Sequence, residues 1–318
     1  PGKGYAAGET AANAVSEPPI QGLALNTKHS AGASEGTKKE FTGLGYLEQM
    51  LQMPENFKDK ATLSSQEGTV TKIEEAPQGG TNVYINDEKH YVLPQFSPEV
   101  STGQKVEQGQ KISEGLVNPA EVTKYRGLGE GRKAFIDAFG GVLKDSGVPA
   151  NKRNLETLAR SMFNHVKVDE IDENTGHLPG DITYYNNVVN SYSPRSDAKK
   201  RSVTGSIDKY LEEPALHYTI GTKITPSMAK DLEKNNYKSV LTHDREPSFE
   251  PTALRLSSAK QHDDDWLTQM STSNLKSNFL DAARQGKDTT LEGNTHFAPA
   301  LASRPMHFGE KTHDTGKF

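Results

Sequence analysis

The stretch LALNTKHSAG holds the side chains most able to do chemistry near the start of the chain. His29 follows Leu25 by four residues, so on a helix the imidazole and the leucine side chain share one face. Gly32 and Gly36 follow at once and can serve as hinges. A histidine in this setting can contact a substrate, but a surface histidine near a helix end is the more frequent interpretation. The rest of the chain has to decide between the two.

A second candidate is the acidic run HDDDW at His262 to Trp266. Adjacent aspartates point to different sides of a helix, so a solvated surface or a first helical turn is favoured over a metal site. The chain has no cysteine. That excludes disulfides, thiolate zinc sites and cysteine nucleophiles, and it fits a reducing cytoplasm.

The composition limits the class of protein. The 318 residues are 33% hydrophobic with a mean hydropathy of −0.74, which is polar for a self-contained enzyme. The net charge of −5 gives no overall basic footprint for nucleic acid. There is no apolar run of about 18 residues and no signal peptide, so no membrane location is expected. Because the sequence starts at once with helix-like residues, we expect a fragment of something larger.

The elements that position His29 are predicted to be helical. Small residues dominate Gly4 to Ala14, and Pro18-Pro19 breaks this helix before a second one from about Ile20 to Ser30. Thr42 is the expected N-cap of a third helix, Gly43 to Met53, which ends at Pro54. Its apolar face would comprise Leu44, Leu47, Met50 and Leu51.

The segment from Gly68 to Gly115 has the period of strands. GTVTKI, NVYI and HYVL alternate apolar and polar residues between turn signals, and Gly103, Gly109 and Gly115 separate very short strands. This pattern predicts a small twisted β-domain.

Helices are expected again from Asn118 to His165, with Asn118 as N-cap and Pro119 in the first turn. Two apolar stripes follow, Ala134, Phe135, Ala138, Phe139, Val142 and Leu143, and then Leu155, Leu158, Ala159, Met162 and Phe163.

The remainder of the chain is mixed. Short strands are expected from Val166 to Asn190 around Leu178-Pro179-Gly180, an exposed basic loop from Ser191 to Ser202, and helices at Pro226–Asn235 and Leu267–Gln285. The tail beyond Pro299 is expected to be flexible. The predicted fold class is α+β with several modules: 1–63, 64–117, 118–190, a loop-rich insertion at 191–250, 251–302 and a tail at 303–318.

The order of these segments resembles the C-terminal part of the largest subunit, β′, of multisubunit RNA polymerases. GKGYAAGETAANAVSEP and LALNTKHSAG are similar to the first trigger helix, and TKKEFTGLGYLEQMLQMPEN to the second. The segment ending in GQKVEQGQKISEG resembles the bacterial sandwich-barrel hybrid domain. NPAEVTKYRGLGEGRKAFIDAFGGVLKDSGVPANKRNLETLARSMFNHVKV resembles the helical module after it, and FLDAARQGKDTTLEGNTHFAPALA the end of β′.

The resemblance implies roles for individual residues. The trigger helices of this family close over the incoming nucleotide, and the position of the phosphate-contacting histidine is His29. The resemblance places Leu25 against the base and Asn26, an asparagine of the archaeal and eukaryotic type, near the ribose. Gly32 and Gly36 would let the tip fold and unfold in each addition cycle. Whether His29 also donates a proton stays open.

Several positions depart from the family pattern. The sugar-contacting glutamine is expected seven residues before His29, where Gly22 stands, and Gln21 is rotated from that position by about 100°. Lys28 replaces an aromatic residue, and Tyr46 replaces an arginine of the second helix. Where β′ has Phe-Gln-Glu-Thr-Thr near downstream DNA, this chain has TSNLK, in which Lys276 is a candidate phosphate contact.

The family holds magnesium in an Asn-Ala-Asp-Phe-Asp-Gly-Asp loop, a run that this sequence does not contain. The resemblance therefore implies a split β′, inactive alone, whose magnesium site lies on an N-terminal β′ chain. β-like subunits, DNA template, RNA, nucleotides and possibly an initiation factor complete the implied assembly. A large bacteriophage is the favoured source, acting in the host cytoplasm, with virion packaging open.

Two other classes stay open. GQKVEQGQKISEG also resembles biotinyl and lipoyl carrier domains, for which Lys89 is the one candidate modified lysine, although its hairpin comes early in the domain. A phage structural protein with a fortuitous motif is the other alternative.

Overall fold

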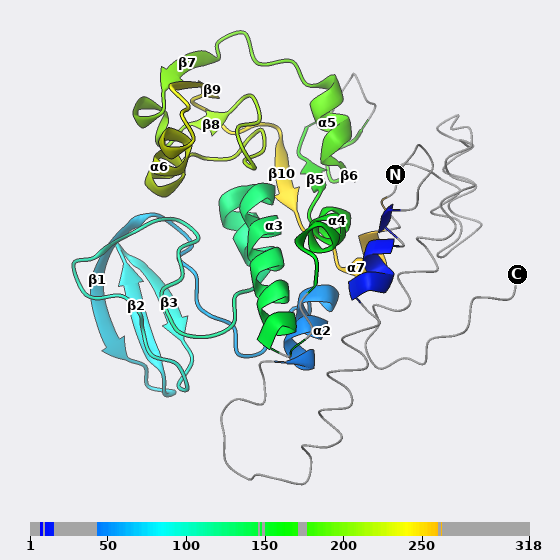
Figure 1. Cartoon of the computed structure of the whole chain (residues 1–318). Helices are drawn as coiled ribbons and strands as arrows, with labels where there is room; N and C mark the ends of the chain where they lie inside the picture. Colours follow the sequence, from blue (N-terminus) through cyan, green and yellow to red (C-terminus); the bar gives the residue numbers. More distant parts are fainter. Residues whose placement is uncertain are drawn as a thin grey trace, which may run out of the picture. The chain divides into compact units, whose positions relative to one another are not determined.

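A computed structural model gives the structure of the chain and describes residues 7–8, 10–15, 43–145, 147, 150–170, 177–259 and 262 (Figure 1). The described residues fall into two compact units, each assembled from segments that are distant in sequence. The first unit draws on Pro1–Pro54, Phe135–Asn164 and Leu254–Phe318, and the second is built from Glu55–Ala134 and His165–Ala253.

The first unit is helical where it is described. Its elements are residues 10–15, α2 (Leu44–Gln52), the C-terminal part of α3 (Pro119–Asp145), α4 (Lys152–Met162) and the short α7 (Leu256–Ala259). Helix α7 packs against both α2 and α4. Three phenylalanine rings pack against one another, tilted, in the interior of this unit. The ring of Phe135 is centred 5.2 Å from that of Phe139 and 5.3 Å from that of Phe163.

The apolar stripes predicted for these helices are confirmed. Helix α4 is capped by Asn151, whose side chain accepts a hydrogen bond from the backbone N–H of Arg153. Buried positions fall every three or four residues, which is the helical period. They include Leu47, Met50 and Leu51 on α2, Phe135, Phe139, Val142 and Leu143 on α3, and Leu155, Leu158, Ala159, Met162 and Phe163 on and after α4.

The predicted start of the trigger-like helix is off by one residue. Helix α2 begins at Leu44 with Gly43 at the N-cap and no side-chain cap, so Thr42 is not the N-cap. Apolar periodicity fixes which face of a helix is buried but not its first residue. The helix ends where it was expected to end, at Met53 in the left-handed conformation (φ 45°), followed by Pro54.

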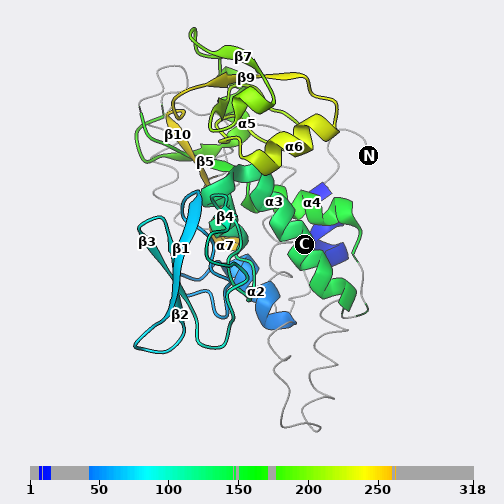
Figure 2. The same ribbon diagram turned by 90° about the vertical axis from the view of Figure 1, so that its left-hand side faces the viewer.

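The second unit begins with the predicted β-domain. Strands β1 (Gly68–Glu75), β2 (Thr81–Ile85), β3 (Glu88–Val92) and β4 (Lys105–Val106) form one antiparallel sheet in the order β3-β2-β1-β4 (Figure 2). Its core is aliphatic and consists of Val70, Val83, Ile85, Val92, Val100, Val106 and Ile112.

Glycines set the turns of this domain as predicted. Gly103, Gly109 and Gly115 all have positive φ, at 86°, 71° and 122°. At Gly115 a Cβ atom would lie 2.7 Å from the backbone nitrogen of Ala61, so the close approach of two chain segments also requires glycine there.

Helix α3 begins as predicted, with Pro119 in its first turn and the Asn118 side chain accepting from the N–H of Ala120 at 3.0 Å. The helix is interrupted at Gly127, whose φ of 86° and ψ of 172° are not helical. The kink is a consequence of glycine's freedom at this position.

A second antiparallel sheet, in the order β10-β5-β6, confirms the short strands expected around Leu178-Pro179-Gly180. It comprises β5 (His165–Val168), β6 (Ile182–Tyr184) and β10 (Phe249–Thr252), and α5 (Tyr185–Ser191) follows β6. Their core consists of Leu128, Val166, Tyr185, Val188, Ile220 and Phe249.

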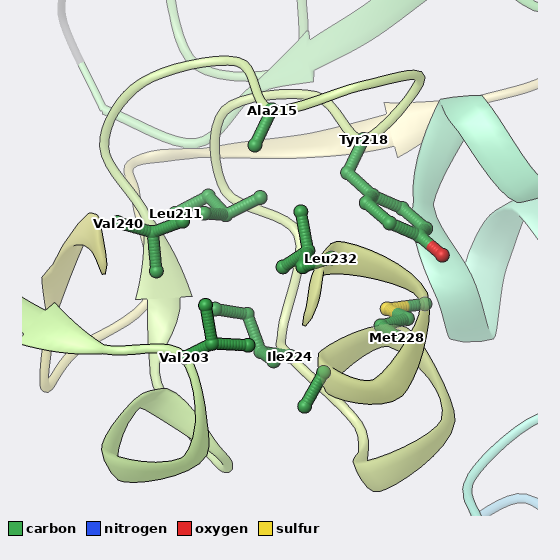
Figure 3. Packing of buried hydrophobic residues seen from close by; sticks show 9 residues of the cluster. Val203, Leu211, Ala215, Tyr218, Ile224, Met228, Leu232 and Val240 are labelled. Carbon is green, nitrogen blue, oxygen red and sulfur yellow. The ribbon is translucent and has the colours of Figure 1, made fainter. Parts of the chain in front are cut away.

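The region predicted as a loop-rich insertion is more regular than expected. It contains β7 (Lys199–Ser202), η2 (Thr204–Ser206), β8 (Tyr210–Leu211), α6 (Pro226–Lys234) and β9 (Ser239–His243), with sheet order β7-β9-β8. Their side chains enclose a separate core that includes Val203, Leu211, Ile224, Met228, Leu232 and Val240 (Figure 3).

Two predictions in this region have different outcomes. The exposed loop at Ser191–Ser202 is wrong at both ends, because Ser191 ends α5 and Lys199–Ser202 forms β7. Strands of two to five residues are too short to show an alternating pattern. The helix at Pro226 is confirmed, with Thr225 as N-cap and an end one residue before the predicted Asn235.

Candidate functional site

The residues to which the sequence assigns contact with substrate lie outside the described residues. They are Gln21, Leu25, Asn26, His29, Gly32, Gly36 and Lys276. Their roles therefore stay predictions. What the structure describes is the helical segment before them and the helix after them.

The segment before them, residues 10–15, buries one face, which consists of small side chains. Ala11, Ala12 and Val15 are exposed by only 2%, 7% and 0%. Alanine contributes little apolar area, but it lets a helix approach its neighbours closely. This segment is therefore stabilised by close approach to its neighbours, because its buried side chains are small.

The helix after them, α2, explains one departure from the family pattern. Tyr46, which stands where the resemblance expects an arginine, is buried with 6% exposure. An arginine is rarely buried without a charged partner, whereas a tyrosine ring adds apolar area to the interior. The burial of Tyr46 therefore suits a tyrosine at this position better than the arginine that the resemblance leads us to expect.

The second unit contains a pocket of about 220 Å³. Most of its lining comes from three segments, residues 124–128 of α3, residues 219–223 and residues 246–251, and Gln108, Val166, Asp169 and Tyr210 complete it. Both polar and apolar side chains line the pocket, among them Lys124, Tyr125, Arg126, Tyr210, Lys223, Glu246 and Phe249.

The main cation of this pocket is already paired. Arg126 donates from Nη2 to Ser227 Oγ at 2.8 Å and lies 3.6 Å from Glu107 and 3.7 Å from Glu130. Glu107 in turn accepts from the backbone N–H and the hydroxyl of Ser227, at 2.8 and 2.6 Å. Arg126 thus links the β-domain, α3 and the start of α6, and two carboxylates offset its charge.

Two other charged side chains of the pocket, Lys223 and Glu246, are also engaged. Lys223 lies 3.3 Å from Asp208 and 3.8 Å from Glu67. The hydroxyl of Tyr210 donates to Glu246 at 2.7 Å, and burial together with this bond raises the pKa of Tyr210 above its usual value. Such mutual pairing supports rigidity and does not activate a nucleophile or a base.

The most buried charge described in the second unit is Glu212, which the sequence did not single out. Its carboxylate accepts from Arg195 Nε at 2.8 Å, from Arg195 Nη2 at 2.5 Å, and from the Tyr192 hydroxyl at 2.7 Å. The Arg195 guanidinium also donates to the carbonyls of Arg245 and Glu246.

Hydrogen bonding decides the charge state of Glu212. Burial by itself would raise the pKa of this carboxyl, but the bonds from Arg195 and Tyr192 outweigh it and hold the pKa below its usual value. Burial, followed by the bond to the Glu212 carboxylate, raises the pKa of Tyr192. The ion pair between Arg195 and Glu212 thus connects the segment at residue 195 to residue 212 and to the loop at 245–246. Its contacts stabilise the fold.

Metal binding finds no support in the part of the chain that the structure describes. No group of three or more His, Asp or Glu side chains there could hold an ion. Of the run HDDDW only His262 is described, and burial lowers its pKa. The assignment of magnesium to another chain stays a prediction.

The lysine that a carrier domain would modify is not at a hairpin tip. Lys89 lies within β3, opposite Tyr84 of β2, and the turn between the strands is formed by Asn86 and Asp87. A carrier lysine needs the tip of such a turn, so the position of Lys89 does not favour that alternative. None of the described helices is both long and apolar enough to cross a membrane.

No family model matches the sequence. The chain is 32% identical over 184 residues to the DNA-directed RNA polymerase subunit β′ of Acholeplasma laidlawii, 30% over 183 residues to that of Acetivibrio thermocellus, and 28% over 182 residues to that of Heliobacterium modesticaldum. Each match covers 56% of this chain but only 13–15% of the relative. Over more than half of its length, the chain is thus similar to a small part of β′ subunits of DNA-directed RNA polymerase.

Proposed function

We propose that this chain is a C-terminal part of the β′ subunit of a DNA-directed RNA polymerase and contributes the trigger helices of a nucleotidyltransferase. The observation that carries the proposal is the similarity to β′ subunits over 56% of the chain. The collinear order of five β′-like motifs, from LALNTKHSAG to FLDAARQGKD, supports it independently.

In this proposal the segment between residues 20 and 53 closes on the incoming nucleotide. His29 orients the triphosphate and stabilises the charge that develops on the leaving pyrophosphate, Leu25 packs against the base, and Asn26 and Gln21 lie near the sugar. Helix α2, which has a buried apolar face and is followed by Met53-Pro54, is the second trigger helix in this proposal. Residues 64–117 are the counterpart of the sandwich-barrel hybrid domain.

The chain acts within an assembly. The magnesium-binding aspartates belong to an N-terminal β′ chain, and β-like subunits complete a cleft for DNA, RNA and nucleotides. This chain is inactive alone. A bacteriophage origin, with the enzyme working in the host cytoplasm, remains part of the same proposal.

Purification of the native complex through a C-terminal tag, followed by mass spectrometry, tests this proposal. We expect a chain with the Asn-Ala-Asp-Phe-Asp-Gly-Asp loop and at least one β-like chain in stoichiometric amounts. The same preparation should extend RNA on a DNA template in the presence of Mg²⁺. Recovery of the protein alone, folded and monomeric, would remove the support for a polymerase subunit.

A further inference from the structure

The pocket of about 220 Å³ in the second unit has a size that suits a small ligand. Sites for drug-sized ligands enclose roughly 300–1,000 Å³, so this one is better matched to a short linear molecule or a single side chain than to a nucleotide. All of its lining residues belong to the second unit. Its chemistry is therefore set by one compact part of the chain.

Hydrogen bonds fix the walls of this pocket. The Arg195 guanidinium donates to the carbonyl of Glu246 at 2.9 Å, and the Tyr185 hydroxyl accepts from the backbone N–H of Ile220 at 2.8 Å. Glu246 and Ile220 both line the pocket, and they lie on two of its three main segments. Because these segments are already ordered, little conformational entropy is lost when a ligand binds between them.

Three charged side chains of the lining have no ionic partner. The carboxylates of Asp169 and Glu250 and the ammonium group of Lys124 lie more than 4.0 Å from any opposite charge in the part of the chain that the structure describes. All three are exposed, and Lys124 Nζ lies 5.7 Å from the centre of the Tyr125 ring. Lys167 is opposite Glu250 in the sheet but does not line the pocket. The lining thus offers two unpaired carboxylates and one unpaired ammonium group.

Carboxylates also outnumber the paired cations of the lining. Arg126 and Lys223 each lie within 4.0 Å of two carboxylates, which belong to Glu107, Glu130, Asp208 and Glu67. Lys133 and His217 add positive charge near Glu130. Even with Lys133, His217 and Lys167 counted as cations, the lining residues and their partners carry more negative than positive charge.

The pKa values of two tyrosines in the lining agree with a negative surrounding. Burial, followed by the bond to the Glu246 carboxylate, raises the pKa of Tyr210. Burial also raises the pKa of Tyr125, and the charges of Glu121 and Glu88 raise it further. An environment that opposes a new negative charge favours a positive one in the same place.

The aromatic rings of the lining indicate the kind of cation. Tyr125, Tyr210 and Phe249 supply ring surface, which stabilises an ammonium or guanidinium group and packs against an alkyl chain. A divalent metal ion needs several oxygen ligands that converge, and no group of three or more His, Asp or Glu side chains within the described ranges could hold one. The lining therefore suits an organic cation.

We propose that this pocket binds an organic cation, in the form of a primary ammonium or guanidinium group on a short alkyl chain. Asp169 and Glu250 supply the opposite charge, and the rings of Tyr125, Tyr210 and Phe249 supply the apolar contact. A free polyamine has this chemistry, and so has a lysine or arginine side chain of a neighbouring subunit. The proposal does not depend on the proposed function.

Hydrogen exchange of the purified full chain tests the pocket, with spermidine, N-acetylarginine amide, Mg²⁺ and inorganic phosphate as probes. We expect spermidine, the arginine derivative or both to slow exchange in peptides covering residues 219–223 and 246–251. Protection by spermidine alone assigns a free polyamine, whereas protection by the arginine derivative, with or without spermidine, assigns a side chain of a partner. Protection by Mg²⁺ or phosphate alone, or by no probe, would overturn the proposal.

Substitution of the unpaired charges shows the sign of the recognition. The double variant Asp169→Asn/Glu250→Gln should raise the dissociation constant of the protecting probe about tenfold, because both opposite charges are lost. Lys124→Gln should lower that constant by a factor of about three, because a like charge is removed. Asp137→Asn removes an exposed carboxylate of α3 outside the pocket, so it is the matched control and should change nothing. Shifts of the opposite sign, or equal constants for all variants, would contradict binding of a cation here.

The same preparation separates binding from folding. The substituted side chains are exposed, so thermal midpoints should stay near that of the wild type. A gain of affinity cannot come from misfolding, so Lys124→Gln decides the proposal if the double variant unfolds. Added salt should weaken binding of the probe. No other subunit is needed for these measurements, so their failure is distinguishable from failure of the polymerase assignment.

Discussion

The two compact units are stabilised in different ways. Every ion pair that the structure records between described residues joins two residues of the second unit, from Lys60–Glu121 to Arg245–Asp197. The described part of the first unit is instead joined by apolar helix faces and by the stacked rings of Phe135, Phe139 and Phe163.

This difference has a mechanical meaning. Apolar packing is non-directional, so helices can shift slightly and retain most of their contact area. Hydrogen-bonded charges hold only in one geometry. The first unit, to which the predicted trigger segment belongs, is thus expected to tolerate movement, and the second unit is expected to resist it. The predictions below test whether apolar packing stabilises the first unit and ion pairs stabilise the second.

The largest expected effect belongs to the predicted trigger segment. In the reconstituted complex, His29→Ala should slow single-nucleotide addition by about 10²–10³, the loss expected for one electrostatic stabiliser of a transition state. Unfolding of the chain should not change. His177→Ala, in the second unit, is the matched control and should stay near the wild-type rate. Unimpaired addition by His29→Ala would remove His29 from the site.

The buried ion pair should dominate the stability of the second unit. Arg195→Ala leaves Glu212 buried without its partner, and we expect a loss of about 3 kcal/mol in the local free energy of opening. Hydrogen exchange of peptides covering β7, β8 and β9 measures this loss. Amides of α2 and α4 in the first unit should keep their protection.

Arg201→Ala is the control for that experiment. Arg201 bonds both oxygens of Asp244, whose side chain is 53% exposed, at 3.1 Å, and it also donates to the carbonyl and hydroxyl oxygens of Thr242 at 3.2 and 2.8 Å. Because its removal leaves no buried charge unpaired, the loss should be smaller than for Arg195→Ala, at about 1 kcal/mol. Equal losses for Arg195→Ala and Arg201→Ala would mean that burial of Glu212 is unimportant.

Leu47 tests the apolar character of the first unit. Its side chain is fully buried on α2, and Leu47→Ala should cost about 2–4 kcal/mol through lost burial and the cavity left behind. Because no ionisable group is removed, the cost should be the same at pH 7 and pH 4. Denaturant unfolding followed by exchange of α2 amides measures it. A strong pH dependence would contradict an apolar first unit.

Acid should loosen the second unit before the first, and this is the smallest effect. The pKa of Glu212 lies below its usual value in the folded chain, as do the pKa values of Glu130 and Asp244. A lowered pKa contributes stability above the ordinary value of about 4.5 for Glu, and this contribution is lost as the pH falls through the folded-state pKa. Exchange should therefore be unchanged between pH 7 and pH 5 and show progressive opening at β7–β9 from pH 5 to pH 3, with α2 and α4 less affected.

Local signals predicted much of this fold. The buried faces of α3 and α4, the N-cap at Asn118, the glycine turns of the β-domain and the helix at Pro226 each depend on residues within one or two turns of each other. Such information is contained in spacing and side-chain type, and a single sequence displays it.

Contacts between distant residues could not be predicted in this way. Glu212 finds its partners 17 and 20 residues away, and the Arg195 guanidinium reaches carbonyls 50 and 51 residues further on. The strands of the β7-β9-β8 sheet are too short to alternate visibly, so the sequence predicts a loop-rich segment there with one helix at Pro226–Asn235. The roles of residues in the predicted trigger segment come only from the resemblance to β′ subunits. The role of His29 therefore stays a prediction.

The bond between Glu107 and Ser227 sets an order of events during synthesis. The two residues are 120 positions apart, and the carboxylate of Glu107 accepts from the N–H and the hydroxyl of Ser227 in the first turn of α6. At about 5–20 residues per second, a ribosome needs about 6–24 s to make the intervening chain. For that interval a completed β-domain would present Glu107 and Arg126 without their serine. Nascent chains stalled within this window should therefore be the ones most open to proteases and chaperones.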